Sequence, residues 1–217
     1  MQNDIDPRPI IVDIETAALA NAGDYCDPVE PDSRLKDPQK IKDNILDKTI
    51  ARSEKYGLDR NTGRIVAIGW WTEASGTMSV TAPDAEAERS VLESFWTLAK
   101  HRTIITFNGR SFDLPFMLQR SLLLNVQGPM EMDTRPYHSL TDNIDVFLAL
   151  TYGDKSGICM RQTLGAFCRR FGIPHDDSVS GKDVQRLVDA GEWDAVLKHV
   201  TDDIDSTVAL ARRVRLL

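Results

Sequence analysis

The sequence predicts one α/β or mixed α+β domain. Its 217 residues suit a single full-sized core, and a hydrophobic content of 41% with a charged content of 27% is ordinary for a globular protein. Apolar segments rich in β-branched residues come first and then alternate with segments of helical period. That order is typical of a sheet covered by helices.

The elements follow from periodicity and from their boundary residues. The predicted strands are 9–15, 64–72, 77–82 and 103–107. The predicted helices are 84–100, 112–124, 161–171, 180–190 and one within 192–217. Segment 144–152 is either the start of a helix or a short strand. Together these elements fill residues 1–217 as a single domain.

A helical insertion is expected at about 24–62, between the first two strands. Residues 24–34 are rich in Pro and Asp and should form a loop. Residues 37–56 should form a helix, because Asp37 is a suitable N-cap and Pro38 suits the first helical position. From Lys36 to Arg64 there are eight Lys or Arg residues and five Asp or Glu residues, so this stretch is positive, which fits either contacts with phosphates or an ordinary solvated helix face.

Composition excludes several classes of protein. The longest apolar runs are far shorter than a membrane span, so no membrane partner is expected, and the first residues show no signal peptide. Cys26, Cys159 and Cys168 lack CxxC spacing, which fits free thiols and a cytoplasmic location. The net charge of −7 argues mildly against non-specific nucleic-acid binding, although metal ions held by several carboxylates would offset part of it.

Acidic residues in three separate apolar segments carry the functional prediction. On the first strand, Asp13 and Glu15 project together because side chains at i and i+2 share a face. Two adjacent carboxylates repel each other, and a divalent cation relieves that repulsion. Taken alone, the pair also fits exposed acids at a strand end, and Asp113 also fits the N-cap of the helix that begins near it.

The last helix gives the sharpest geometry. With Val196 at 0° and a step of 100° per residue, Asp203 falls within about 40° of the centre of the apolar stripe. Asp202 lies off that stripe, and Asp205 points to the opposite side. His199 lies one turn before Asp203 on the same face. Asp203 is therefore the acid of this helix that should face the core or a cleft.

Three motifs together resemble those of the DEDD superfamily of 3′–5′ exonucleases. They are Asp13-Ile14-Glu15-Thr16, Asn108-Gly109-Arg110-Ser111-Phe112-Asp113 and His199-Val200-Thr201-Asp202-Asp203. Over about residues 9–215, the chain looks most like stand-alone relatives of the exonuclease domain of family B DNA polymerases. The resemblance implies a ribonuclease-H-like α/β fold, in which helices flank a mixed central β-sheet. One feature departs from the family pattern: three residues separate His199 from Asp203, which is the spacing of the family's Tyr-x3-Asp branch and not of its His-x4-Asp branch, so His199 stands where that branch has tyrosine.

The resemblance also implies a chemistry. Mg²⁺ or Mn²⁺, two ions per site, would activate a water and stabilise the leaving 3′ oxygen. Asp13 would bridge both ions, Glu15 and Asp203 would complete one site, and Asp113 would support the other. His199 would hold or deprotonate the attacking water. The expected substrate contacts are Thr16, Asn108, Phe112, Arg161 and Lys182.

The expected activity is metal-dependent 3′–5′ exonuclease action on single-stranded or frayed ends of DNA, with release of nucleoside monophosphates. A 3′–5′ exoribonuclease of the same fold is an alternative, because discrimination depends on how the 2′-hydroxyl is accommodated. A non-catalytic nucleic-acid-binding module is another, which the presence of all four carboxylates disfavours. No polymerase motif is visible, so a proofreading role would need a separate polymerase or repair partner.

Overall fold

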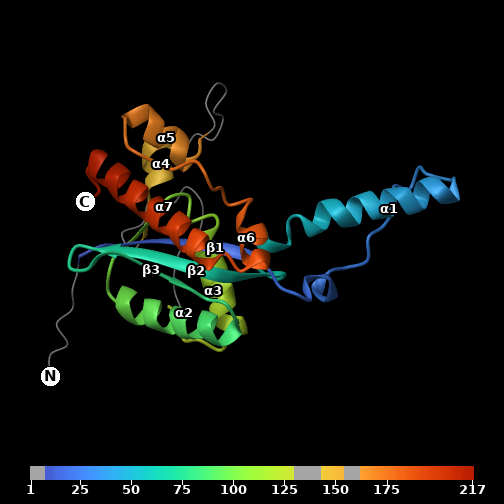
Figure 1. Ribbon diagram of the computed structural model, residues 1–217, viewed down its shortest axis with the longest axis horizontal. Coiled ribbons are helices and arrows are strands. Elements are labelled where there is room, and N and C mark those ends of the chain that lie inside the picture. Colours follow the sequence, from blue (N-terminus) through green and yellow to red (C-terminus); the bar gives the residue numbers. More distant parts are fainter. Residues whose placement is uncertain (1–7, 130–142, 154–161) are drawn as a thin grey trace.

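A five-stranded mixed sheet in the order β3-β2-β1-β4-β5 lies at the centre of the protein (Figure 1). This computed structural model describes residues 8–129, 143–153 and 162–217. β1 and β2, and likewise β2 and β3, are antiparallel, whereas β4 and β5 run parallel to β1. The strands are β1 Ile10–Ala18, β2 Gly63–Thr72, β3 Gly76–Thr81, β4 Ile104–Thr106 and β5 Asn143–Asp145.

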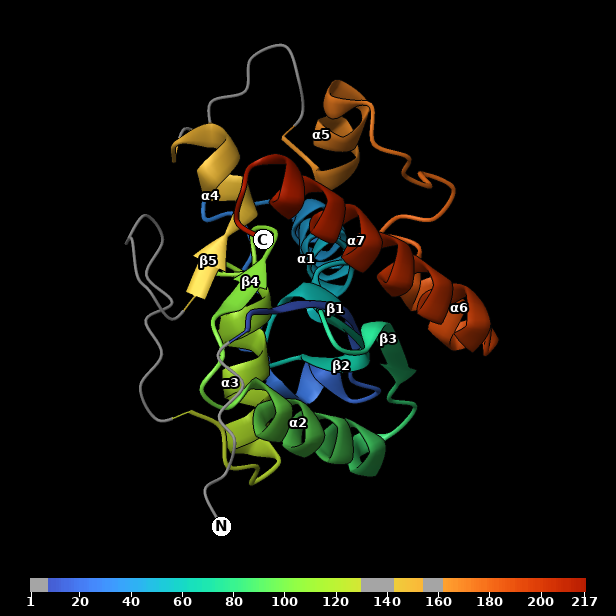
Figure 2. The ribbon, with the colours of Figure 1, turned by 90° about the vertical axis from the view of Figure 1, so that its left-hand side faces the viewer.

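Helices cover both faces of this sheet, which confirms the predicted α/β class (Figure 2). On one face lie α2 (Ala85–Ala99) and α3 (Asp113–Leu123), and on the other α7 (Trp193–Arg213) crosses the strands. Three shorter helices accompany α7: α4 Val146–Thr151, α5 Leu164–Phe171 and α6 Val184–Ala190. Within the described residues, no helix is long and apolar enough to cross a membrane.

Strand β1 contributes to the cores on both faces through its alternating side chains. Ile10, Val12 and Ile14 are buried against α2 and α3, while Ile11 belongs to the core beneath α4, α5 and α7. Because alternate residues share a face, the side of β1 that faces α7 also carries Asp13 and Glu15. The strand continues three residues beyond the predicted end, to Ala18.

Gly69 on β2 lets α7 approach the sheet closely. In the β1–β2 pairing, Gly69 stands opposite Asp13. A Cβ atom at Gly69 would lie 2.8 Å from Cγ1 of Ile204 and 3.0 Å from Cγ2 of Val200, so a larger residue would push α7 away. The acidic residues of α7 are thereby brought close to those of β1.

Two helices differ from the sequence prediction at their ends. The helix expected at 37–56 is α1 (Pro38–Ser53), with Asp37 as its N-cap as predicted, but a 3₁₀ turn (η2, Tyr56–Leu58) replaces its expected last residues. The helix expected to begin at Ser180 begins at Val184. The backbone N–H and the hydroxyl of Ser180 both donate to the Asp183 carboxylate, which closes a turn instead of capping a helix there.

Two other segments have helix or strand bounds that differ from the prediction. The segment 144–152 contains both of the alternatives that its sequence allowed, because β5 ends at Asp145 and α4 begins at the next residue. The helix expected at 161–171 begins at Leu164, where Thr163 is the N-cap. The positions of Cys159 and Arg161 lie outside the described residues.

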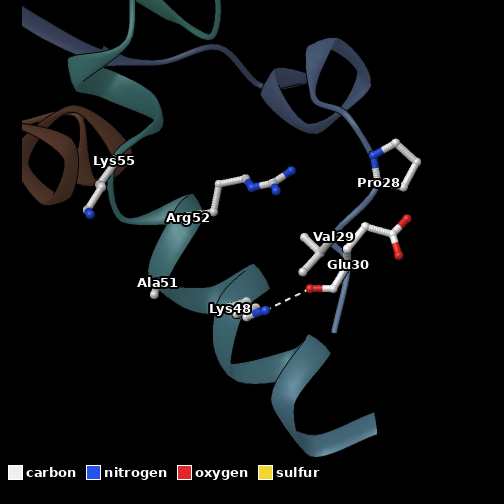
Figure 3. A pocket seen from close by; sticks show the side chains of 7 residues that line it. All are labelled: Pro28, Val29, Glu30, Lys48, Ala51, Arg52 and Lys55. Atoms are coloured by element: carbon white, nitrogen blue, oxygen red, sulfur yellow. Dashed lines mark hydrogen bonds between the residues drawn. The ribbon is translucent and has the colours of Figure 1, made fainter. Parts of the chain in front are cut away.

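The insertion between β1 and β2 forms an arm that projects from the rest of the molecule (Figure 1). Its extended segment runs beside α1, none of whose residues is buried. The Lys48 ammonium donates to the carbonyl of Glu30 over 2.8 Å (Figure 3). Arg52 donates to the carbonyl of Asp27. These two cations hold the arm together, and a shallow groove separates its two segments.

The arm as a whole is close to neutral, although residues 36–64 within it are positively charged. Over residues 19–62 there are eight Lys or Arg residues and nine Asp or Glu residues, because the extended segment is acidic. Lys48 and Arg52 already bind backbone carbonyls. Phosphate contact by the remaining exposed cations of residues 36–64 stays a prediction.

Candidate metal and active site

Carboxylates from three elements meet beside β1. Asp13 and Glu15 come from β1, Asp113 is the first residue of α3, and Asp203 with His199 comes from α7. The metal-binding atoms of Glu15, His199 and Asp203 all lie within 4.8 Å of one another. The structure therefore brings together side chains that are separated by up to 190 residues in the sequence.

Asp113 reaches β1 at the point where β4 no longer accompanies it. The parallel pairing of β1 with β4 involves only Ile10 and Ile11 of β1. Further along β1, the backbone N–H of Ile14 donates to Oδ1 of Asp113 over 3.1 Å. The alternative that Asp113 is an N-cap is wrong, because Phe112 occupies that position and the Asp113 carboxylate turns towards β1 instead.

The phase predicted for the last helix is confirmed. Val196 and Val200 are fully buried, and the Asp203 side chain is 20% exposed on the same side of α7. Asp202 pairs with Lys198 over 2.6 Å, away from the sheet. Asp205 is exposed, although it is more than a bare surface charge, because it accepts a hydrogen bond from the Thr77 hydroxyl of β3.

His199 lies between two of the carboxylates. Its Nε2 atom is 3.3 Å from Oε1 of Glu15, and its Nδ1 atom is 3.8 Å from Oδ1 of Asp203. Burial lowers the pKa of His199 below its ordinary value, and the nearby His175 adds to this effect, so the neutral ring is favoured near pH 7. A neutral ring that donates from Nε2 to Glu15 has its Nδ1 lone pair free to accept a proton on the Asp203 side.

Burial and mutual repulsion raise the pKa of all four carboxylates. Burial is the largest cause in each case, and for Asp13 the charges of Asp113, Asp203 and Glu15 add to it. The pKa of Asp113 and that of Asp203 are each raised to about 7. Such a group is unfavourable when ionised, and a divalent cation is the species that stabilises it.

The residues present fit a divalent cation. Oδ1 of Asp203 is buried and accepts no hydrogen bond from the described residues, although buried carboxylate oxygens are normally satisfied. It belongs to the same cluster as the Glu15 carboxylate and the His199 ring. A donor set made mainly of carboxylate oxygens suits Mg²⁺ or Mn²⁺ better than softer metals.

Asp145 supports this site although the sequence prediction gave it no role. Its buried carboxylate accepts the backbone N–H of Asn108 at 2.7 Å and that of Phe147 at 3.0 Å on Oδ1, and that of Arg110 at 3.4 Å on Oδ2. These bonds fix the loop that leads into α3 and Asp113, in which Asn108 has a φ of 61°. The sequence signal that could have found it is an acid at the end of an apolar segment, as in Asn143-Ile144-Asp145-Val146.

The expected substrate contacts are more scattered. Thr16 is buried on β1 directly after a shift in the β1–β2 register. Asn108 is half-buried in the β4–α3 loop, and the Phe112 ring packs on the α2–α3 core with its centroid 5.5 Å from that of Phe116. Lys182 is exposed in the turn before α6. Arg161 lies outside the described residues.

Comparison with known proteins agrees with this arrangement. Residues 58–217 match a family described as "predicted 3′-5′ exonuclease related to the exonuclease domain of PolB", and this range includes Asp113, His199 and Asp203. No curated protein matches the chain.

Among solved structures, a family B DNA polymerase from the hyperthermophilic archaeon Pyrobaculum calidifontis is similar. The match has a TM-score of 0.66 and 18% sequence identity over 97% of this chain. The chain spans about a quarter of the length of that polymerase, 25%. The likeness extends to the mixed sheet and its flanking helices, which form the ribonuclease-H-like α/β fold.

Proposed function

Because the chain belongs to the family of predicted 3′–5′ exonucleases related to the exonuclease domain of PolB, we propose that it removes nucleotides from the 3′ end of DNA with the help of divalent metal ions. The observation that carries this proposal is the buried cluster of Glu15, His199 and Asp203, whose metal-binding atoms lie within 4.8 Å of one another. Its unpartnered Asp203 oxygen supports a cation rather than a structural role.

Asp13, Glu15, Asp113 and Asp203 are the residues that would hold Mg²⁺ or Mn²⁺, two ions in the site. Asp13 would gain from such ions, because Asp113, Asp203 and Glu15 all repel its charge. When bound, such ions supply activation of a water and stabilisation of the charge on the leaving 3′ oxygen.

His199 is the residue that we assign to proton transfer. Glu15, whose Oε1 is 3.3 Å from Nε2, would orient the ring, which would leave Nδ1 to take a proton from the attacking water. A position next to Glu15 and Asp203 would also suit a metal ligand. The two roles differ in one measurable way, since only a ligand would change the affinity for metal when it is replaced.

DNA is the substrate that we propose, because the family is related to a DNA polymerase domain and the similar structure is itself a DNA polymerase. Asn108 and Phe112 would position the terminal nucleotide from the loop that leads into α3, and Thr16 and Lys182 would extend the contact. We place the protein in the cytoplasm, in line with its cysteines. An RNA substrate would require the same site to accept a 2′-hydroxyl.

The test is incubation of the purified protein with 5′-labelled single-stranded DNA, matched RNA and duplexes, in Mg²⁺, Mn²⁺ or EDTA. We expect a ladder of 3′-shortened DNA that requires metal. Asp203→Asn should remove it, whereas Asp205→Asn on the exposed side of the same helix should keep it. Shortening of the RNA alone would replace DNA by RNA as the substrate, and cleavage in EDTA would contradict the role of the metal.

A further inference from the structure

Arg110 is a buried arginine, and two of its three guanidinium nitrogens have no hydrogen-bond partner among the described residues. The residue is 3% exposed, and its Nε and Nη2 atoms make no hydrogen bond with any described residue. Arg120, which is 5% exposed, shows what a buried arginine normally has, because it donates two bonds of 2.8 Å to the Glu88 carboxylate. An unpaired buried guanidinium is strongly unfavourable, so its presence points to an anion that completes it.

The same loop holds a second polar side chain without a partner. The hydroxyl of Thr106, at the end of β4, is buried and makes no hydrogen bond with the residues that the structure describes. Gly109 lies directly against it, and a Cβ atom there would be 2.6 Å from the hydroxyl oxygen. Two unsatisfied polar groups within five residues mark this loop as a place where a polar ligand is missing.

The position of the loop fits a ligand site next to the carboxylate cluster. β1, β4 and β5 are parallel, and the loop leaves the carboxyl end of β4, where ligands bind in open sheets of this kind. Asp113, three residues after Arg110, accepts the backbone N–H of Ile14, which lies between Asp13 and Glu15, and Asp145 at the end of β5 accepts the Arg110 backbone N–H. β4 is the immediate neighbour of β1, at a strand spacing of about 5 Å.

Asp145 itself is not the missing counter-ion. Its two oxygens accept backbone N–H groups from Asn108, Arg110 and Phe147. No carboxylate among the described residues forms an ion pair with the Arg110 guanidinium, in contrast to Glu88 with Arg120. The anion must therefore come from outside the described chain.

We propose that Arg110 binds the oxygens of a phosphate group, either in the nucleic-acid strand or in the released nucleoside monophosphate. The planar guanidinium can offer two parallel N–H donors to such a group, which an ammonium cannot. A cation at this place offsets the repulsion between the phosphates of a strand and the four carboxylates beside β1. This assignment rests on the proposed nuclease function, because that function supplies the phosphate.

The first measurement is thermal unfolding in EDTA, without ligand, of the wild type, Arg110→Met and Arg120→Met. Arg110→Met should unfold at the wild-type temperature or above it, because no interaction is lost. Arg120→Met should unfold at a lower temperature, because Glu88 is left buried and unpaired. If Arg110→Met is as unstable as Arg120→Met, Arg110 is a structural residue and the proposal is wrong.

The second measurement is binding of a labelled single-stranded oligonucleotide, and separately of a nucleoside 5′-monophosphate, in EDTA, where the metal-dependent cleavage is off. Arg110→Met should weaken binding by about 10–100-fold, the range for charge-assisted hydrogen bonds. Its salt dependence for the oligonucleotide should become shallower by about 0.7 in log–log slope, since one phosphate contact is lost. The affinity of Arg110→Lys should lie between those of the wild type and Arg110→Met, because lysine keeps the positive charge but loses the two parallel N–H donors.

The two binding arms identify the source of the phosphate. Weakened binding of the oligonucleotide alone assigns the phosphate to the strand, and weakened binding of both ligands assigns it to the terminal nucleotide. Unchanged affinity and unchanged salt slope in Arg110→Met would overturn the proposal, even if the wild type shortens DNA. Conversely, a wild type that binds through Arg110 but cleaves nothing would refute only the exonuclease function.

Discussion

Buried charge is handled in opposite ways on the two sides of the sheet, and α3 takes part in both. On the α2 side, the fully buried Glu88 accepts two bonds from Arg120 and one from the backbone N–H of Ile65, each 2.8 Å long. Every charge in that pair is matched. On the α7 side, Asp13 and its neighbouring carboxylates repel one another, and Oδ1 of Asp203 accepts nothing from the described residues.

The Glu88–Arg120 pair is satisfied by folding alone, whereas the carboxylates beside β1 require a ligand to balance their charge. Breaking a buried ion pair strongly destabilises the protein, but the intact pair has no free hydrogen-bonding group with which to bind a ligand. An unmatched buried cluster opposes folding and persists because something else stabilises the protein around it. On this comparison, changes in the α7-side cluster should affect activity without loss of stability, and changes in the Glu88–Arg120 pair should do the reverse.

The largest effect is expected from Asp13→Ala. This substitution should reduce exonuclease activity below detection, because Asp13 is a buried carboxylate whose charge is repelled by Asp113, Asp203 and Glu15 and would hold the metal with them. The metal-free variant should unfold at the wild-type temperature or above it, since a repelling charge is removed. Activity assays and thermal unfolding in EDTA check the two parts. Near-normal turnover, or a variant that fails to fold, would contradict the claim that the carboxylates on the α7 side serve activity and not stability.

His199→Ala should have the next largest effect. Loss of a group that takes the proton from the attacking water lowers turnover by about 10²–10⁴-fold. Metal affinity, measured by calorimetry with Mn²⁺, should change far less, and His199→Tyr should retain more activity than His199→Ala because a phenol still hydrogen-bonds water. A large loss of metal affinity would instead make His199 a ligand, and full activity would leave it a packing residue.

Glu88→Gln tests the matched side. The neutral side chain leaves Arg120 buried without its counter-charge, which should reduce the free energy of unfolding by about 3–5 kcal/mol. Exonuclease activity per folded molecule should stay within a factor of about two, because Glu88 lies on the face of the sheet opposite to α7. Denaturant unfolding together with turnover at low temperature measures both. A loss of turnover without a loss of stability would contradict the assignment.

The sequence predicted those parts of the site that depend on local periodicity. The two-residue repeat of β1 placed Asp13 and Glu15 on one face, and the 3.6-residue repeat of α7 selected Asp203 over Asp205. Both inferences need only neighbouring residues. The fold class also followed, because the strand and helix segments are strongly periodic and their order is simple.

Other parts depended on contacts between distant segments. Asp113 finds its partner at Ile14 only because β4 stops accompanying β1, and α7 approaches β1 only because Gly69 has no side chain. The isolation of Arg110 is a property of everything around it, and no local pattern reveals it. Lys48 and Arg52 likewise look like free cations in the sequence but bind carbonyls across the arm.

The smallest expected effect is the pH dependence of stability in the metal-free protein. The pKa of Asp113 and that of Asp203 are raised to about 7 in the folded state, from an ordinary value of 3.8. Between those values the folded protein binds more protons than the unfolded chain, so the free energy of unfolding falls as pH rises through this window. His199, whose pKa is lowered by burial from an ordinary value of 6.5, acts in the opposite sense below that pH.

A scan from about pH 6.5 to about pH 8 therefore isolates the carboxylates from most of the histidine effect. Over this range each of two groups with a pKa of about 7 contributes a little under 1 kcal/mol, so these two alone should make unfolding in EDTA easier by about 1–2 kcal/mol. Asp13 and Glu15, whose pKa is also raised, act in the same direction. Mn²⁺ should abolish or reverse the trend, because it stabilises the ionised carboxylates. Glu88→Gln should shift the whole curve downwards without changing its slope, since its charge lies in the matched pair. A metal-free wild type that is more stable at pH 8 than at pH 6.5 would show that the carboxylates beside β1 are already satisfied by the protein, and the contrast between the two sides of the sheet would then disappear.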